Sequence, residues 1–388
     1  MLTKNISFIN FPKKKIPDIK KILNKIKKKY LEGNDSLLLS LSDKYKYSFD
    51  LKKINKFKNY KNYKIIGMGG SILGAEAIYS FLKKKIRKNF TFLDNLQEGS
   101  EIKDKNKTLT IVISKSGNTL ETISNLNSNK IKSNLLFITE NKKNYLRELA
   151  QKFKSEVIEH KNYIGGRYSV LSEVGMLPAE LMGLSEKKFK QMNNLIKNKS
   201  FINQLIQNVE STLSLNKNGK CNSVILNYDA SSQNLFYWYQ QLVAESLGKK
   251  SKGILPIISS MPKDNHSVMQ LYLDGTKNNF FTFFDVVRKN TKDIENKELL
   301  SSHLYLKDKN IQKIILAQKL ATQNVFKKKK IPFRSFTIYK KDEKTLGELF
   351  CFFILETILL GKALKVNPYD QPSVELIKIE TKKILSRT

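Results

Sequence analysis

A glutamine and a glutamate stand one helical turn apart in the segment QQLVAESLGK. Gln241 and Glu245 are four residues apart, so a helix would place both side chains on one face. The apolar residues Leu242, Val243 and Ala244 precede the glutamate and predict that its carboxyl group is partly buried. Burial raises the pKa of a carboxyl group towards that of a useful general base. On this segment alone, a surface glutamate on an amphipathic helix remains the favoured alternative.

An arginine directly follows two glycines in the segment YIGGRYS. The chain has arginine at only six positions and uses lysine almost everywhere else. Arg167 therefore indicates a place that needs a planar, permanently charged group. A structural salt bridge is the alternative explanation for this residue.

Two glycine- or hydroxyl-rich segments follow predicted strands and could bind an anion. GMGGS, from Gly67 to Ser71, lets the backbone approach a ligand and leads into a helix start with free N–H groups. SKSGNTLET, from Ser114 to Thr122, gathers four hydroxyl side chains and a lysine at another helix start, which suits a phosphate monoester. A tight turn and an ordinary capped helix are the respective alternatives. The first segment also lacks the full spacing of a dinucleotide-binding loop.

Two further segments contain residues that could act on a substrate. DNHS carries His266, one of only three histidines, although a lone loop histidine more often has no catalytic role. YDQPSVELIK begins a predicted last helix at Pro372, a residue suited to the first helical turn. Lys378 would lie about two turns into that helix.

The elements that position these segments alternate between strand and helix. YKIIGMG, TLTIVIS and NLLFITE each read as a short strand followed by a helical pattern, and SVILNYD, NFFTFFDVV and PFRSFTIYK form a second such series. This alternation predicts an α/β fold of two doubly wound parallel-sheet domains flanked by helices. We expect helices of residues 1–58 to pack on the first lobe, with domains at 59–200 and 201–388, and helical residues near 185–215 to join the two sheets.

Composition bounds the class of protein. A chain of 388 residues with a formal net charge of +35 could suggest a nucleic-acid partner, but its lysines are dispersed rather than clustered. Cys221 and Cys351 lack the spacing of metal ligands or of a disulfide framework, which fits a reducing cytoplasm. The apolar stretch 349–360 is too short to span a membrane and contains Glu356, so it predicts a buried helix. We therefore expect neither a nucleic-acid nor a membrane partner.

Taken together and in this order, the segments resemble the glucose-6-phosphate isomerase family, which is built from two sugar-isomerase domains. The resemblance covers about residues 64–378 and rests on GMGGS, ISKSGNT, GGRYSVLS, QQLVAESLGK, DNHS and YDQPSVELIK. It implies interconversion of an aldose phosphate and a ketose phosphate, with no cofactor and no metal. It also implies a homodimer whose active sites lie between the lobes at the subunit boundary.

The resemblance assigns roles residue by residue. Glu245 would be the proton-transfer base, and Arg167 with the backbone of Gly166 would stabilise the enediolate. His266 would assist ring opening from the neighbouring subunit, and Lys378 would lie near the ring oxygen. The substrate would be bound by Gly70, Ser71, Ser114, Lys115, Ser116, Thr119, Gln241 and Gln371.

The chain departs from the family in being shorter than most members, which implies a smaller dimer interface. The phosphate segment Ser116 to Thr119 also resembles that of isomerases that accept both glucose and mannose phosphates. A dual phosphoglucose and phosphomannose isomerase is therefore one alternative. A non-catalytic regulator that binds a sugar phosphate is another, although regulators of this kind usually have one such domain beside a DNA-binding motif.

Overall fold

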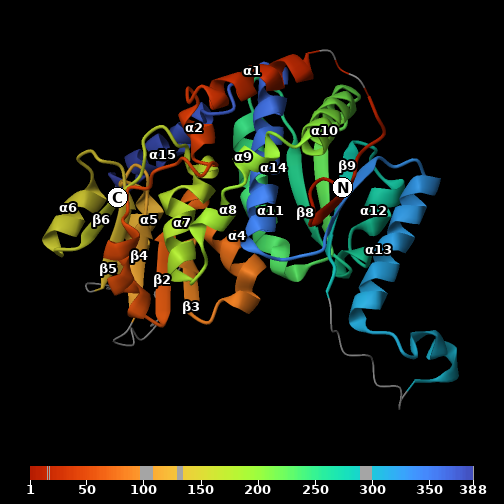
Figure 1. Ribbon diagram of the computed structural model, residues 1–388, viewed down its shortest axis with the longest axis horizontal. Helices are drawn as coiled ribbons and strands as arrows, with labels where there is room; N and C mark the ends of the chain where they lie inside the picture. Colours follow the sequence, from red (N-terminus) through yellow and green to blue (C-terminus); the bar gives the residue numbers. More distant parts are fainter. Residues whose placement is uncertain (15, 17, 97–107, 129–133, 289–298, 388) are drawn as a thin grey trace.

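The computed structural model describes residues 1–14, 16, 18–96, 108–128, 134–288 and 299–387. These residues form two α/β lobes, each with a five-stranded sheet (Figure 1). Three helices lie between the two sheets, namely α4 (Leu73–Leu82), α11 (Gln233–Leu247) and α14 (Glu343–Ala363). Helix α14 contains the stretch predicted as a buried helix, and its residues from Thr345 to Gly361 are buried, which confirms that prediction.

The sheet of the first lobe has the order β3-β2-β4-β5-β6, and all its strand pairs are parallel. Its strands are β2 (Asn62–Gly67), β3 (Asn89–Leu93), β4 (Thr108–Ile113), β5 (Leu135–Thr139) and β6 (Glu156–Glu159). Its other helices are η2 (Gly69–Ser71), η3 (Lys83–Lys85), α5 (Leu120–Ser128), α6 (Tyr145–Lys152), η4 (Gly166–Leu171) and α7 (Glu173–Leu181). The central strands are almost wholly buried, as in a sheet covered on both faces.

The sheet of the second lobe has the order β8-β7-β9-β10-β1. Its strands are β7 (Asn222–Asn227), β8 (Leu255–Ser260), β9 (Asn279–Val286), β10 (Phe333–Ile338) and β1 (Ile6–Ile9). Around it lie η5 (Ala230–Ser232), η6 (Lys263–Asn265), α12 (Met269–Asp274), η7 (Ser301–Leu306) and α13 (Ile311–Lys328). The last helix of the chain is α15 (Pro372–Leu385). The two sheets thus have the same strand order and the similar connectivity that the sequence predicts, apart from β1.

The N-terminal segment only partly follows the prediction that residues 1–58 are helices packed on the first lobe. Strand β1 instead pairs antiparallel with β10 of the second lobe, because Ile6 and Phe8 alternate with Ser7 and bury one face of the strand. Helix α1 (Ile19–Leu31) is amphipathic as predicted, but it packs on α14 and on α10 (Lys199–Lys217). The prediction is therefore wrong for β1 and α1.

Later residues of the same segment do contact the first lobe. This part contains α2 (Ser36–Leu39), α3 (Leu51–Ile54) and η1 (Asn55–Asn59). The Tyr45 hydroxyl donates to Glu173 of α7 at 2.8 Å, and Lys58 pairs with Glu180 at 3.1 Å. Helices α8 (Glu186–Phe189), α9 (Met192–Leu195) and α10 then lead from the first sheet to the second, where a helical connection is expected. The domain boundaries after residues 58 and 200 remain predictions.

Three further strands lack a clear strand pattern in the sequence and were not predicted. Strands β3, β6 and β8 are short or carry polar residues, as in the sequences NFTFL, EVIE and LPIISS.

No helix in the described ranges combines the length and apolar character needed to cross a membrane.

Candidate active site

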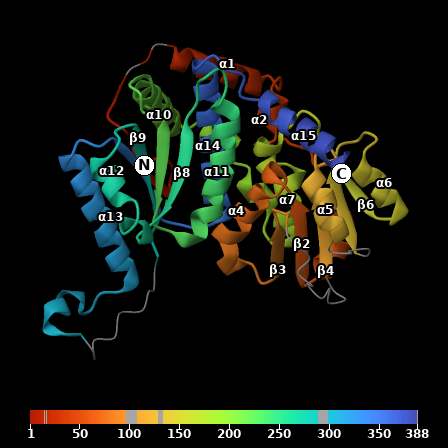
Figure 2. The ribbon, with the colours of Figure 1, turned by 180° about the vertical axis from the view of Figure 1, so that it is seen from behind.

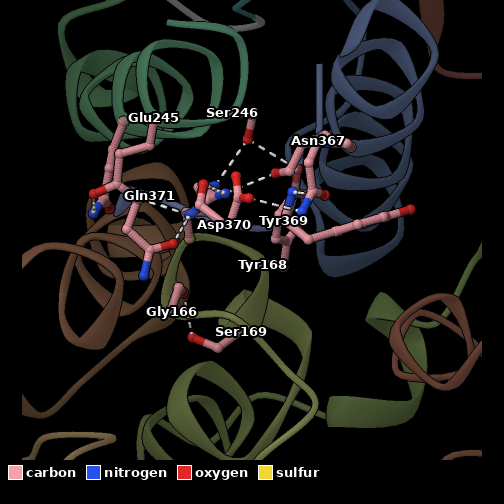
Figure 3. Close-up of polar contacts among 12 residues, drawn as sticks. Gly166, Tyr168, Ser169, Glu245, Ser246, Asn367, Tyr369, Asp370 and Gln371 are labelled. Atoms are coloured by element: carbon pink, nitrogen blue, oxygen red, sulfur yellow. Dashed lines mark hydrogen bonds and ion pairs between the residues drawn. The ribbon is translucent and has the colours of Figure 1, made fainter. Parts of the chain in front are cut away.

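The Arg167 side chain donates hydrogen bonds to residues from separate parts of the chain, and Figure 3 shows three of these partners, Glu245, Ser246 and Gln371, gathered in one polar cluster. Arg167 is 2% exposed, and all five of its N–H groups donate. One terminal nitrogen donates to Glu245 Oε2 at 3.0 Å and to Gln371 Oε1 at 2.8 Å, and the other donates to the carbonyl oxygens of Pro368 and Asp370 at 2.7 and 3.0 Å. The Arg167 Nε–H donates to Ser246 Oγ at 2.8 Å. Every donor of the planar guanidinium group is therefore engaged, an arrangement that the single ammonium group of a lysine could not reproduce.

Two hydroxyl groups behind the guanidinium fix its orientation. The Tyr168 hydroxyl donates to the carbonyl oxygen of Pro368 at 2.9 Å and lies 2.9 Å from Ser246 Oγ. Since the single phenol proton goes to the carbonyl, Ser246 is the donor in the second contact. Burial raises the pKa of Tyr168, which keeps the phenol protonated. Arg167 is therefore held in one position by η4, α11 and the segment after α14.

Glu245 and Gln241 meet on one face of α11, as their spacing predicts. Gln241 Nε2 donates to Glu245 Oε1 at 3.1 Å, while the other carboxylate oxygen takes the hydrogen bond from Arg167. The Glu245 side chain is 28% exposed, so it is partly buried and still reachable. Gln241 Oε1 is buried and has no hydrogen-bond partner among the described residues. A buried amide oxygen of this kind has an unmet need for a donor, which a substrate hydroxyl can supply.

The glycines of GMGGS let two loops approach closely. A Cβ atom on Gly70 would lie 2.1 Å from the carbonyl carbon of Gly166, and a Cβ on Gly69 would lie 2.7 Å from Gln241 Nε2. Gly69 also has a φ of +52°, in the left-handed region that favours glycine. The segments GMGGS, GGRYS and QQLVAES, which are far apart in the chain, therefore converge at one place.

The hydroxyl-rich segment after β4 forms a compact loop before α5. Ser114 Oγ lies 2.8 Å from Thr119 Oγ1 and accepts the Gly117 N–H at 3.2 Å, whereas Ser116 is exposed. Lys115 Nζ donates to the carbonyl oxygen of Asn162 at 2.7 Å and lies 3.5 Å from Glu140. The loop gathers hydroxyl groups at a strand end, and its role as a phosphate cradle remains a prediction.

Ser71 comes from the neighbouring strand end and closes η2. Strands β2 and β4 pair with Gly67 opposite Ile113, so Ser71 and Ser114 follow adjacent strands at the same edge of the sheet. Parallel strands bring such residues together at their carboxyl ends, where ligands of open α/β sheets bind.

His266 and Lys378 are not brought into this cluster. His266 follows η6 and is exposed, and its side chain makes no hydrogen bond to Glu245 or Arg167 within the described ranges. Lys378 lies on the exposed helix α15 and pairs with Glu375 at 2.6 Å. Of the predicted catalytic residues, the single chain thus assembles Glu245 and Arg167 only.

The structure adds residues that sequence interpretation did not single out. Lys249 Nζ lies 3.1 Å from Asp370 Oδ1 and donates to the carbonyl oxygen of Ser246 at 3.1 Å. The hydrogen bond from Lys249 lowers the pKa of Asp370. Together with Ser246 and Tyr168, these residues hold the segment before Gln371 against Arg167. Main-chain carbonyl acceptors such as those of Pro368 and Asp370 have no side-chain signature, so no pattern could have indicated them.

Comparison with known proteins decides the family. The sequence profile described as phosphoglucose isomerase matches residues 51–388, which include every residue of the cluster. The chain belongs to the phosphoglucose isomerase family. The expected resemblance is thereby confirmed, and the structure confirms the α/β fold of two sheets that are parallel apart from β1.

Relatives within the family match over most of their length. The chain is 32% identical to glucose-6-phosphate isomerase of Methanocaldococcus jannaschii, with 88% of this chain and 87% of the relative covered. It is also 32% identical to the glucose-6-phosphate isomerase of Mycoplasmopsis pulmonis, with coverage of 83% and 82%.

Solved structures support the fold. A hypothetical protein from Thermus thermophilus superposes with a TM-score of 0.82 at 23% identity, covering 95% of both chains. A glucose-6-phosphate isomerase from Chlamydia trachomatis gives a TM-score of 0.71 at 19% identity, covering 87% of this chain and 72% of that one. At these identities the likeness concerns the arrangement of the two sheets.

Proposed function

We propose that Glu245 moves the proton that interconverts glucose 6-phosphate and fructose 6-phosphate. The interconversion follows from membership of the phosphoglucose isomerase family, which favours catalysis over the alternative of a non-catalytic regulator. The observation that supports Glu245 is its carboxylate, held between the Gln241 amide and the Arg167 guanidinium in a partly open position. The carboxylate form, which can accept a proton, is thus presented with a fixed orientation.

The reaction suits this group of residues. An aldose and its ketose differ by a hydrogen on C1 or C2 and by which oxygen is the carbonyl, so one carboxylate can take a proton from one carbon and return it to the other. The enediolate that forms between these steps carries negative charge. The fixed guanidinium of Arg167 and the Gly166 backbone would offset that charge, an effect that for one oxyanion donor is about 3–4 kcal/mol. Since all five Arg167 donors have partners, the nitrogen shared by Glu245 and Gln371 must exchange a partner for the substrate.

Substrate binding is proposed for the residues around this centre. The phosphate would lie between Gly70 and Ser71 after β2 and the loop that contains Ser114, Lys115, Ser116 and Thr119 after β4. Gln241, with its unused amide oxygen, and Gln371, on Arg167, would bind sugar hydroxyl groups. These assignments follow the match between this chain and the family motifs.

We further propose that the chain acts as a homodimer in the cytoplasm. Helix α15 lies across the end of the first lobe near α2 (Figure 2), and Leu376, Ile377 and Ile379 on it are more than half exposed. An exposed apolar helix face of this kind marks an interaction surface. A partner chain would cover it and could also bring His266 to Glu245, which a single chain does not do. Reduced Cys221 and Cys351, which form no disulfide, fit a reducing compartment.

The Glu245→Gln variant tests the role of the carboxylate. The amide has nearly the same shape but cannot accept a proton, so turnover should fall by several orders of magnitude while the fold and substrate affinity persist. Glu148→Gln, which changes an exposed glutamate on α6, is the matched control and should retain full turnover. A Glu245→Gln rate above about a tenth of wild type would be a loss of under ~1.4 kcal/mol and would exclude Glu245 as the base.

A further inference from the structure

The second lobe repeats the construction of the phosphate-binding edge of the first. Strand β2 leads through η2 into α4, and β7 leads through η5 into α11 in the same way. Strands β2 and β7 hold the same place in the two sheet orders, as do β4 and β9, and β5 and β10. The residues after β7 and β9 therefore correspond in position to the proposed phosphate-binding loops after β2 and β4, and the residues after β10 correspond to those after β5.

In the second lobe an aspartate directly precedes η5, at the position that Met68 holds before η2 in the first lobe. Asp229 follows β7 and its side chain is 2% exposed. Its Oδ2 accepts the Ser231 hydroxyl at 2.9 Å and the Ser232 hydroxyl at 2.6 Å, both from η5. One carboxylate oxygen is thus held by two hydroxyl groups at the start of α11.

Two cations from the neighbouring strand ends complete the cluster. Arg288, after β9, donates to Asp229 Oδ1 at 2.7 Å, and Lys341, after β10, donates to Asp229 Oδ2 at 2.8 Å. Burial alone would raise the pKa of Asp229, but Lys341, Ser232 and Arg288 more than offset this and lower it to about 2. The carboxylate is therefore ionised and surrounded by hydroxyl and cationic donors.

This donor set is the one that a phosphate group takes. Two hydroxyl groups, an arginine, a lysine and a helix start are the partners that phosphate oxygens accept from in proteins. Without the aspartate the cluster would hold two positive charges and no negative one. Arg288 is 41% exposed, so an ion from solvent could reach it.

We propose that Asp229 is a built-in anion that fills the phosphate position of the second lobe and so limits each chain to one sugar-phosphate site. The comparison with the first lobe rests on the proposed role of the loop from Ser114 to Thr119. The cluster around Asp229 itself does not depend on Glu245 or on the isomerase reaction.

The Asp229→Ala variant of the full chain tests this inference with inorganic phosphate as the probe. Phosphate is titrated calorimetrically into wild type and variant, and the number bound per chain is compared. Asp229→Ala should bind one more phosphate per chain than wild type, because the emptied position keeps both cations and both hydroxyl groups. Asp229→Asn should bind no additional phosphate, since its amide still occupies the position. Adding Lys341→Gln to Asp229→Ala should remove the additional site.

Two results would overturn the inference. One is a folded Asp229→Ala protein that binds only as many phosphates as wild type. The other concerns an Asp229→Ala protein that is unfolded in phosphate-free buffer. The inference then requires that added phosphate restores its cooperative thermal transition, and a variant that stays unfolded in phosphate would refute it. Isomerase activity of wild type is measured separately, so an inactive wild type would count against the proposed function without affecting the phosphate count.

Discussion

At the scale of single residues, the site depends on one arginine whose every donor is engaged. Arg167 ties together α11, through Glu245 and Ser246, and the segment that ends at Gln371. The two explanations that its sequence position leaves open, a structural salt bridge and a catalytic cation, are therefore compatible. Its contacts position the proposed base, and its charge lies beside the carboxylate of that base.

Arg167→Lys should lower kcat by about 10²–10³-fold with a smaller change in KM, because a lysine lacks the planar fork and places its charge differently. Steady-state kinetics with fructose 6-phosphate measure both constants. An unchanged kcat with a raised KM would assign Arg167 to uniform substrate binding instead.

Glu76 on α4 makes stability depend on pH. Its side chain is 7% exposed, and burial together with the nearby Asp94 raises its pKa to about 7. Between about pH 4.5 and 7 the folded chain keeps a proton that the unfolded chain has released, so this contribution to stability is full below about pH 4.5 and is lost as pH rises through 7.

Glu76→Gln, which mimics the neutral form, should therefore raise the free energy of unfolding by ~1–3 kcal/mol at pH 8 and by almost nothing at pH 4.5. Urea unfolding at both pH values measures the difference. An equal effect at the two values would contradict the shifted pKa.

At the scale of elements, the turn that contains Gly70 must touch the turn that contains Gly166. A methyl group on Gly70 would meet the Gly166 backbone, whereas one on Gly165 would have its nearest neighbour, in the Tyr168 ring, at 3.6 Å. Gly70→Ala should thus separate η2 from η4, lower the free energy of unfolding by ~1–3 kcal/mol and reduce turnover.

Gly165→Ala is the matched control for this prediction, because its φ of −68° suits alanine. It should stay close to wild type in thermal unfolding and turnover. If Gly70→Ala behaved like Gly165→Ala, the close approach of the two turns would not matter for the site.

The sequence predicts elements best where one local pattern decides them. Strand-to-helix alternation located β2, β4, β5, β7, β9 and β10, and the four-residue spacing placed Gln241 beside Glu245. Strand β1 was missed because pairing with β10, more than 300 residues away, is a tertiary event that lysine-rich flanking sequence conceals. Likewise, the carbonyl oxygens that hold Arg167 become visible only when the chain has folded back on itself.

At the scale of the whole molecule, two predicted residues lie outside the cluster of one chain. His266 is exposed and Lys378 lies on the exposed helix α15. The proposed homodimer would account for His266 if each site takes Glu245 from one chain and His266 from the other. Glu245→Gln and His266→Ala chains would each be impaired when pure.

Mixed dimers of these two variants should regain about half of the wild-type activity per dimer, because one of their two sites has both residues intact. The assay follows fructose 6-phosphate formation from the cyclic glucose form after verified subunit exchange. A mixture that never exceeds the average of the two pure variants would show that His266 serves its own chain, or that no such dimer forms.

The proposed function requires the carboxylate of Glu245 to move a proton between neighbouring carbons of the sugar. Conversion of fructose 6-phosphate in deuterated water, followed by NMR, tests this requirement. Wild type should place solvent deuterium at C2 of the glucose 6-phosphate formed, and Glu245→Gln should lose label incorporation and turnover together. Label incorporation or wild-type turnover that persists in Glu245→Gln would contradict it.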